Sequence, residues 1–268
     1  MRTTMSLTLG SIAPFGRPTG GHANFEIPAK PAHLLYLHLL PQRIRGEVAG
    51  SVVAESTSAR MLHETRMLPR WYLPRVDVAV GLLEPSDTST HCPFKGDARY
   101  WNIRVGDRVI ADAFWEYPDP LPDAPPLTDL LAPDLDKLTS WWEEDEEILG
   151  HPKDPFHRVD LRRSSRTVTI SVADAVVAST GRPLAVDETG LPTQWYIPVA
   201  DLDDGLLTPA ETATICPYKG RATYWALRAP GGPIADAAWG YEHPQEGMER
   251  LGGHVCFAAG DDVTVGVS

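Results

Sequence analysis

One twelve-residue motif occurs twice in the chain, and this repetition constrains the fold more than any other feature of the sequence. The first copy runs from Thr90 to Trp101 and reads Thr-His-Cys-Pro-Phe-Lys-Gly-Asp-Ala-Arg-Tyr-Trp. The second copy runs from Thr214 to Trp225 and reads Thr-Ile-Cys-Pro-Tyr-Lys-Gly-Arg-Ala-Thr-Tyr-Trp. A long motif that recurs at one fixed offset, here 124 residues, indicates an internal duplication.

The similarity extends beyond the motif and needs no gaps between residues 43–120 and 167–244. It includes a Trp-Tyr-x-Pro run at Trp71 and Trp195, and an Asp-Ala-x-Trp-x-Tyr run at Asp112 and Asp236. We therefore predict two domains with one strand order. The expected organisation is an extended N-terminal arm over 1–42, a first β domain over 43–140, a linker with a short helix over 141–166, and a second β domain over 167–268.

The local patterns favour strands over helices in both domains. Residues 168–172 and 175–178 are rich in β-branched side chains around an Ala-Asp turn, which is typical of a β-hairpin. The chain also has 25 prolines and 22 glycines, which indicates many turns. The predicted fold class is mainly β, with two tandem, small, antiparallel domains that are barrel-like or sandwich-like. The best helical candidate is the segment 141–149, which ends at Gly150.

The lead-in to the first domain carries a different pattern. Phe25 and Ile27 alternate with polar residues, which predicts an extended arm that packs on the first domain. We expect no equivalent arm in the second domain.

The charge and the cysteine content exclude several classes of protein. The formal net charge is −12, and the densest charged run, Glu143 to Glu147, is acidic, so a nucleic-acid partner is not expected. No apolar run approaches the length of a membrane span, so no membrane partner is expected either. Three cysteines cannot all pair with one another, which favours free thiols and a cytoplasmic location.

The repeated motifs resemble those of a bacterial family of unknown function, the DUF427 family, sometimes labelled nucleotidyltransferase-like. The resemblance rests on the Trp-Tyr-x-Pro run, the long Cys-Pro-aromatic-Lys-Gly motif and the Ile-Ala-Asp-Ala-x-Trp-x-Tyr run. It covers both halves of the chain and implies a small, mainly antiparallel β domain in two tandem copies. It implies no reaction and no catalytic residue.

Cys92 and Cys216 are the candidate nucleophiles of the motif. Each cysteine is followed three residues later by a lysine, Lys95 or Lys219, and His91 adjoins the first cysteine. These groups can lower a thiol pKa. The alternative is a small buried residue in a turn, because free cysteine is among the most buried residue types. The sequence leaves both open, although the histidine is replaced by Ile215 in the second copy.

Lys95 and Lys219 need a fixed partner, because lysine is almost never fully buried unless it is paired. That partner is either an internal carboxylate, such as Glu64 or Asp112 with their counterparts Glu188 and Asp236, or an anionic group of a ligand. Aromatic residues near the motif complete the candidate ligand-binding set, which is Lys95, Tyr100, Trp101, Trp115, Tyr117, Lys219, Tyr224 and Trp225. The rival interpretation of these aromatics is an ordinary hydrophobic core.

Strand alternation orders these aromatic side chains. Tyr100 and Trp101 are adjacent and are predicted to point to opposite faces, whereas Ala113, Trp115 and Tyr117 are predicted to share one face.

Metal and nucleotide chemistry find little support. A structural zinc site needs ligand pairs such as Cys-x-x-Cys, which the chain lacks, so no metal site and no cofactor are expected. Closely spaced carboxylates at Asp201, Asp203 and Asp204 occur only in the second copy, and no glycine-rich phosphate-binding motif is present.

The sequence therefore predicts a protein with a small-molecule groove beside the Cys-Pro-aromatic-Lys-Gly strand. The alternatives are an enzyme that uses Cys92 or Cys216 as a nucleophile, and a structural or interaction module. Histidines at positions 63 and 91 favour the first domain as the one with the chemistry, so the catalytic candidates are His91, Cys92 and Lys95.

Overall fold

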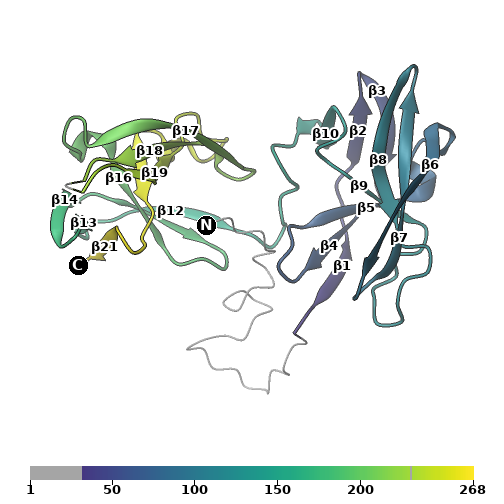
Figure 1. Ribbon diagram of the computed structural model, residues 1–268, viewed down its shortest axis with the longest axis horizontal. Helices are drawn as coiled ribbons and strands as arrows, with labels where there is room; N and C mark the ends of the chain where they lie inside the picture. Colours follow the sequence, from purple (N-terminus) through teal and green to yellow (C-terminus); the bar gives the residue numbers. More distant parts are fainter. Residues whose placement is uncertain (1–31, 230) are drawn as a thin grey trace. The chain divides into compact units, whose positions relative to one another are not determined.

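The computed structural model describes residues 32–229 and 231–268, which divide into two compact units. The first unit ends at Asp154 and the second begins at Pro155. Both units consist of β-strands joined by short turns and single 3₁₀ turns (Figure 1). The predicted mainly β fold in two tandem domains is confirmed.

The first unit is built from two antiparallel sheets. Its seven-stranded sheet has the order β1-β4-β5-β9-β8-β7-β6, and its four-stranded sheet has the order β11-β10-β2-β3. The strands are β1 (Leu35–Leu39), β2 (Ile44–Val48), β3 (Ser51–Ser56), β4 (Arg60–Glu64), β5 (Arg70–Pro74), β6 (Leu83–Cys92), β7 (Gly96–Val105), β8 (Arg108–Glu116), β9 (Leu130–Pro133), β10 (Ser140–Glu143) and β11 (Glu146–Glu147), with 3₁₀ turns η2 (Arg75–Asp77) and η3 (Val80–Leu82).

The second unit repeats this arrangement. Its seven-stranded sheet has the order β12-β15-β16-β20-β19-β18-β17, and its three-stranded sheet has the order β14-β13-β21. The strands are β12 (Val159–Arg163), β13 (Val168–Val172), β14 (Ala175–Thr180), β15 (Leu184–Glu188), β16 (Gln194–Pro198), β17 (Leu207–Cys216), β18 (Gly220–Leu227), β19 (Ile234–Gly240), β20 (His254–Phe257) and β21 (Thr264–Val267), with 3₁₀ turns η4 (Val199–Asp201) and η5 (Glu249–Leu251).

The two seven-stranded sheets correspond strand for strand, and β10-β2-β3 of the first unit corresponds to β21-β13-β14 of the second, so the predicted duplication is confirmed. Strand β11 has no counterpart among the described residues of the second unit. The offset of 124 residues holds from β1, which matches β12, through β10, which matches β21. In the described part of the chain neither large sheet closes into a barrel, so each unit is sandwich-like.

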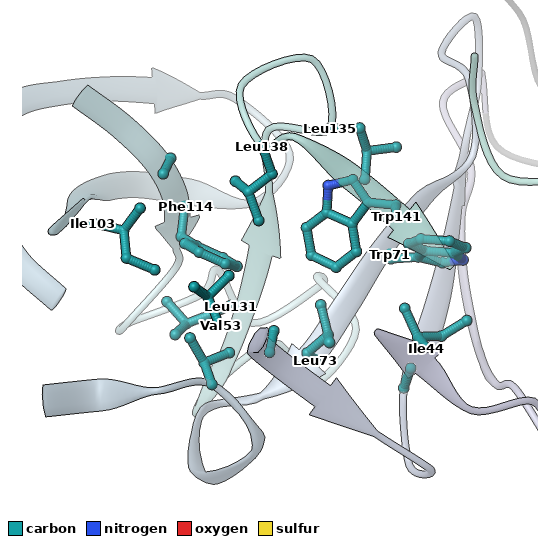
Figure 2. Close-up of a cluster of buried hydrophobic side chains, with 14 of the residues drawn as sticks. Ile44, Val53, Trp71, Leu73, Ile103, Phe114, Leu131, Leu135, Leu138 and Trp141 are labelled. Carbon is teal, nitrogen blue, oxygen red and sulfur yellow. The ribbon is translucent and has the colours of Figure 1, made fainter. Parts of the chain in front are cut away.

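Strand alternation gives each large sheet two apolar faces. In β5, Trp71 and Leu73 pack into the cluster between the two sheets, whereas Tyr72 packs into a second cluster on the opposite face. Figure 2 shows the first cluster, where Trp71, Phe114 and Trp141 gather around smaller aliphatic residues. The second cluster contains the motif side chains and is where the candidate site begins.

The two units fill their cores differently at one cross-strand pair. In the first unit Trp141 lies opposite Gly46, and a Cβ added to that glycine would meet the indole ring at 2.6 Å. In the second unit the same pair is Val265 opposite Ile170. The first unit thus pairs a large side chain with a glycine, where the second unit pairs two side chains of medium size. The two combinations fill a similar volume in the core.

The predicted helix over residues 141–149 is wrong. This segment forms β10 and β11, a hairpin whose turn contains Glu144 with a φ of 54°. The side chain of Trp141 explains the outcome, because it is 3 % exposed and reaches the core only from a strand paired with β2. Tertiary burial of one tryptophan outweighs the weak helical preference of the acidic run.

Both units begin with a strand that the sequence analysis assigned to other segments. β1 lies in the predicted arm and pairs with β4, and β12 lies in the predicted linker and pairs with β15. The second unit thus has a counterpart of the strand that follows the arm. The predicted packing of Phe25 and Ile27 lies outside the described residues.

Face alternation is confirmed for Tyr100 and Trp101, which pack into opposite clusters, but it is wrong for Ala113. Ala113 packs with the inter-sheet cluster, whereas Trp115 and Tyr117 pack on the other face. The cause is a bulge, because the register of β7 and β8 shifts between Trp101 and Ile103, and Asp112 has a φ of 52°.

Candidate functional site

The Cys-Pro-aromatic-Lys-Gly motif forms a tight turn between the two longest strands of each unit. In the first unit this turn joins β6 to β7 and ends at Gly96, whose φ is 103°. A Cβ at Gly96 would lie 3.2 Å from the Asp119 carbonyl oxygen, and one at Gly220 would lie 3.0 Å from the His243 carbonyl oxygen. The glycine is therefore required both for its left-handed backbone and for its close neighbour.

The motif lysines lie inside the protein and form ion pairs with glutamates. Lys95 and Lys219 are each 5 % exposed. The Nζ atom of Lys95 contacts Oε2 of Glu64, and that of Lys219 contacts Oε2 of Glu188. The partner is thus an internal carboxylate, and it is the glutamate and not the aspartate at Asp112, which accepts hydrogen bonds from hydroxyl groups on β6.

A histidine completes each ion pair. Nε2 of His33 lies 3.0 Å from Oε1 of Glu64, and Nε2 of His157 lies 3.0 Å from Oε1 of Glu188. In each unit the histidine, glutamate and lysine follow one another at intervals of 31 residues. The three side chains are therefore brought together by the tertiary fold and not by closeness in the sequence. We call these two sets of three residues the His-Glu-Lys networks.

The electrostatics of the second network hold its glutamate ionised. Burial by itself would raise the pKa of Glu188, but the hydrogen bond from His157 and the charge of Lys219 outweigh it and lower the pKa to about 2. In this network each oxygen of the Glu188 carboxylate has a partner, one in Lys219 and the other in His157. The buried ammonium group of Lys219 is therefore already paired with an internal carboxylate.

Buried phenols surround the networks. The rings of Tyr117 and Tyr241 lie 5.7 Å and 5.9 Å from the lysine Nζ atoms of their units, within cation–π distance. Burial raises the pKa of both tyrosines, so their phenols stay protonated at neutral pH. Trp115 and Trp239 pack on the same clusters, and the indole N–H of Trp239 donates to the Tyr196 hydroxyl at 3.2 Å.

The catalytic candidates of the first unit do not form a catalytic pair. The His91 side chain is 66 % exposed and its Nδ1 lies 2.6 Å from Oδ1 of Asp97. Cys92 is half-buried against the cluster of Tyr72 and Tyr117. Among the hydrogen bonds of residues 32–229 and 231–268, none joins Cys92 or Cys216 to a histidine. All three cysteines are free, as predicted.

The remaining predicted aromatics lie on both faces of the motif strand. The hydroxyl groups of Tyr100 and Tyr224 lie 3.0 Å and 3.1 Å from the hydroxyls of Thr90 and Thr214. On the opposite face, Trp101 and Trp225 are partly buried against the inter-sheet clusters. The two units differ most at these tryptophans.

In the first unit an arginine covers the tryptophan. The Arg75 guanidinium carbon lies 4.4 Å from the centre of the Trp101 ring. Glu116 fixes this arrangement, because Oε2 accepts from Nη1 of Arg75 at 2.9 Å and Oε1 accepts from the Trp101 indole N–H at 3.1 Å. We call this arrangement the arginine plug.

In the second unit both plug residues are absent. Val199 stands at the position of Arg75, and Gly240 stands at the position of Glu116. A cavity of about 440 Å³ lies at this place, partly open to solvent. Its lining consists of Val199, Leu202, Asp203, Asp204, Gly205, Leu207, Trp225, Tyr241, Glu242, Gly253, His254 and Val255.

Neither a metal cluster nor a membrane segment is found among the described residues. No group of three or more His, Cys, Asp or Glu side chains there is arranged to hold a metal ion. Nor does that part of the chain contain a helix of the length and apolarity that a bilayer crossing requires.

Comparison with family models agrees with the duplicated fold. The model of the DUF427 family, described as a domain of unknown function, matches residues 37–144 and again 160–267. The chain belongs to the DUF427 family. A search of curated proteins finds no match.

The two DUF427 units share the buried network and differ around the half-buried tryptophans Trp101 and Trp225. The His-Glu-Lys network, the turn glycine and the Tyr-Thr contact occur in both, which is the behaviour of a framework. The tryptophan is open in one unit and covered in the other. The side chains around the equivalent tryptophans, Trp101 and Trp225, therefore differ between the two units.

Sequence reasoning missed the histidines of the networks and most of the cavity lining. A signal for the first group was present, because His33 and His157 obey the same offset of 124 residues as the motif. The signal for the cavity was the paired loss of Arg75 and Glu116 in the second DUF427 unit, which only the contact between these two side chains makes meaningful.

Proposed function

We propose that this protein binds a small molecule in the cavity of its second DUF427 unit. The observation that carries the proposal is a contrast between the units. A cavity of about 440 Å³ opens beside Trp225, whereas at the equivalent place in the first unit Arg75 stacks over Trp101. The cavity lies beside β18, the strand that follows the Cys-Pro-aromatic-Lys-Gly turn.

The composition of the lining supports binding of an organic ligand. Small-molecule sites are concave and mostly apolar, with a few polar groups that fix orientation. Trp225, Leu202 and Leu207 provide apolar and aromatic surface, and Asp203 and Glu242 provide polar groups. The volume suits a molecule of a few to about twenty heavy atoms, at the lower end of the range of about 300–1,000 Å³ for ligand sites.

The proposal is one of binding. Neither Cys92 nor Cys216 lines the cavity, and neither has a hydrogen bond to a histidine among the described residues. A cysteine-dependent reaction therefore has less support than a binding site at Trp225.

A fragment screen on the full chain tests the proposal. Ligand-observed NMR with a library of varied charge is expected to yield binders of wild type that are lost in Val199→Phe, since this side chain projects from η4 at the lining. Ala200→Phe is the matched control, because Ala200 is the next residue of η4, is exposed and does not line the cavity. A library without binders, or binders that survive Val199→Phe, would overturn the proposal.

A further inference from the structure

The geometry points to a cationic ligand, a guanidinium or an alkylammonium group seated on the Trp225 ring. This inference rests on the proposed function and adds the chemical class of the ligand. It comes from the first unit, which holds a guanidinium of its own at the corresponding place.

The arginine plug is an internal example of the recognition. Arg75 stacks at 4.4 Å from the centre of the Trp101 ring and pairs with a carboxylate oxygen at 2.9 Å. A planar guanidinium over an indole face combines cation–π attraction with a low cost of desolvation, which explains why arginine is frequent in such contacts. The same tryptophan, on the equivalent strand of the equivalent sheet, lines the empty space in the second unit.

Loss of the plug leaves two parts of Trp225 available to a ligand in the second unit. The face of Trp225 has no covering arginine, because Val199 replaces it. The indole N–H, which in the first unit donates to Glu116, has no protein acceptor among the described residues, because Gly240 carries no side chain. It is not among the buried unpaired groups, so solvent reaches it and a ligand can take the place of water. A ligand with a cationic head and an acceptor atom restores both interactions.

The charge of the lining matches such a ligand. Where the second unit lines its cavity with Asp203, Asp204 and Glu242, the first unit has the uncharged residues Ala79, Val80 and Pro118. The carboxylate that Glu116 supplied is thus replaced by three exposed carboxylates around the opening. Anionic ligands meet repulsion here, and cations are attracted.

Two further polar groups lie close to the opening. His254 lines the cavity, and its Nδ1 lies 3.0 Å from the Gly252 carbonyl oxygen, which can accept a hydrogen bond from that nitrogen. Arg228 lies beside Gly205, with its Nη1 3.5 Å from the place of a Cβ on that glycine, but it does not line the cavity. Neither group covers the tryptophan.

A pair of isosteric probes separates charge from shape. We would measure binding of n-propylguanidinium and of n-propylurea to the full chain by calorimetry and by the indole N–H signals in a nitrogen-15 correlation spectrum. The two probes have nearly the same shape. Only the first is charged, and only the second carries an oxygen that can accept from the indole N–H, so tighter binding of n-propylguanidinium reports the charge. We expect n-propylguanidinium to bind at least tenfold more tightly, with a shift of a single indole signal, that of Trp225.

Variants then assign the site. Val199→Arg supplies the missing plug and is expected to reduce the affinity for n-propylguanidinium at least tenfold, whereas Ala200→Arg adds the same charge outside the lining and leaves the affinity within about twofold. The triple variant Asp203→Asn, Asp204→Asn, Glu242→Gln is expected to weaken n-propylguanidinium and to leave n-propylurea unchanged.

The outcomes distinguish this inference from the proposed function. Equal binding of both probes, or preference of the cavity for neutral or anionic fragments, leaves a binding site and overturns the cationic ligand. Absence of any fragment that depends on Val199 overturns the proposed function and this inference together. Binding of n-propylguanidinium that the triple variant does not weaken also overturns the inference.

Discussion

Replacement of Glu188 by glutamine should remove a large, pH-dependent share of the stability of the second unit. The carboxylate is 9 % exposed and joins His157 and Lys219, so Glu188→Gln leaves a buried lysine without its counter-charge. Removing one partner of a buried ion pair costs about 3–5 kcal/mol.

The pKa of Glu188 gives an independent magnitude. It falls from 4.5 to about 2 on folding. A difference of roughly 2.5 pKa units corresponds to about 3 kcal/mol of stability. Because the folded-state pKa is the lower one, this stability is fully present above pH 4.5 and is lost as the pH falls from 4.5 towards 2.

Urea unfolding of the full chain, followed by tryptophan fluorescence from pH 7 to pH 2.5, measures both effects. With a slope of about 1.5 kcal/mol per molar urea, the midpoint of the second unit should fall by about 2 M at pH 7. The control is Glu211→Gln, an exposed carboxylate on β17, which should change stability by less than about 0.5 kcal/mol. A loss below about 1 kcal/mol at pH 7, or wild-type acid sensitivity in Glu188→Gln, would refute this reasoning.

Three further outcomes follow from the packing. Arg75→Val should open the first unit at Trp101, destabilise it by about 1–2 kcal/mol and create a second, weaker site for n-propylguanidinium, which calorimetry detects as a change in stoichiometry. Burial raises the pKa of the Cys256 thiol to about 12, so this thiol should not react with a disulfide reagent in the native protein. We expect two reactive thiols in the native protein and three after unfolding. Reaction of three native thiols at one rate would contradict this. Gly46→Ile alone should cost about 3 kcal/mol by urea unfolding, and adding Trp141→Val should recover part of it; additive losses would argue against the size exchange.

The duplicated architecture was predictable because its signal is local and occurs twice. The motif, the turn glycines and the strand alternation of Tyr100 and Trp101 are properties of short segments. Such local signals could not prevent the wrong prediction of a helix over 141–149. Only the cross-strand partner of Trp141, Gly46, shows why this tryptophan belongs to a strand. Acidic residues beside a tryptophan pair favour a helix until the core is known.

The site that we propose lies beside the strand that the sequence favoured, but in the other unit. The sequence favoured the first unit because histidine adds chemistry at position 91, yet that side chain is exposed and paired with Asp97. The difference between the units is the absence of two side chains. The second unit has no counterpart of Arg75 and Glu116, and there Trp225 lines a cavity. A missing side chain becomes informative only when the contact that it makes in the other copy is seen.

The last prediction concerns Gly240, where the open state is built into the backbone. A Cβ at this position would lie 2.6 Å from the His254 carbonyl oxygen and 3.4 Å from the Trp225 ring, so β19 and β20 approach too closely for any side chain. Gly240→Ala should therefore destabilise the second unit by about 1–3 kcal/mol, the usual cost of overpacking. Glu116→Ala at the equivalent position loses only the contacts of Arg75 and Trp101 and leaves the first-unit backbone unstrained. Urea unfolding of both variants measures the costs, and the crystal structure of Gly240→Ala should show the β19 and β20 strands displaced. If Gly240→Ala leaves the stability of the second unit unchanged, this unit can accept a side chain at position 240 without rearrangement. The cavity would then result only from the absence of the plug side chains, and the backbone would not maintain it.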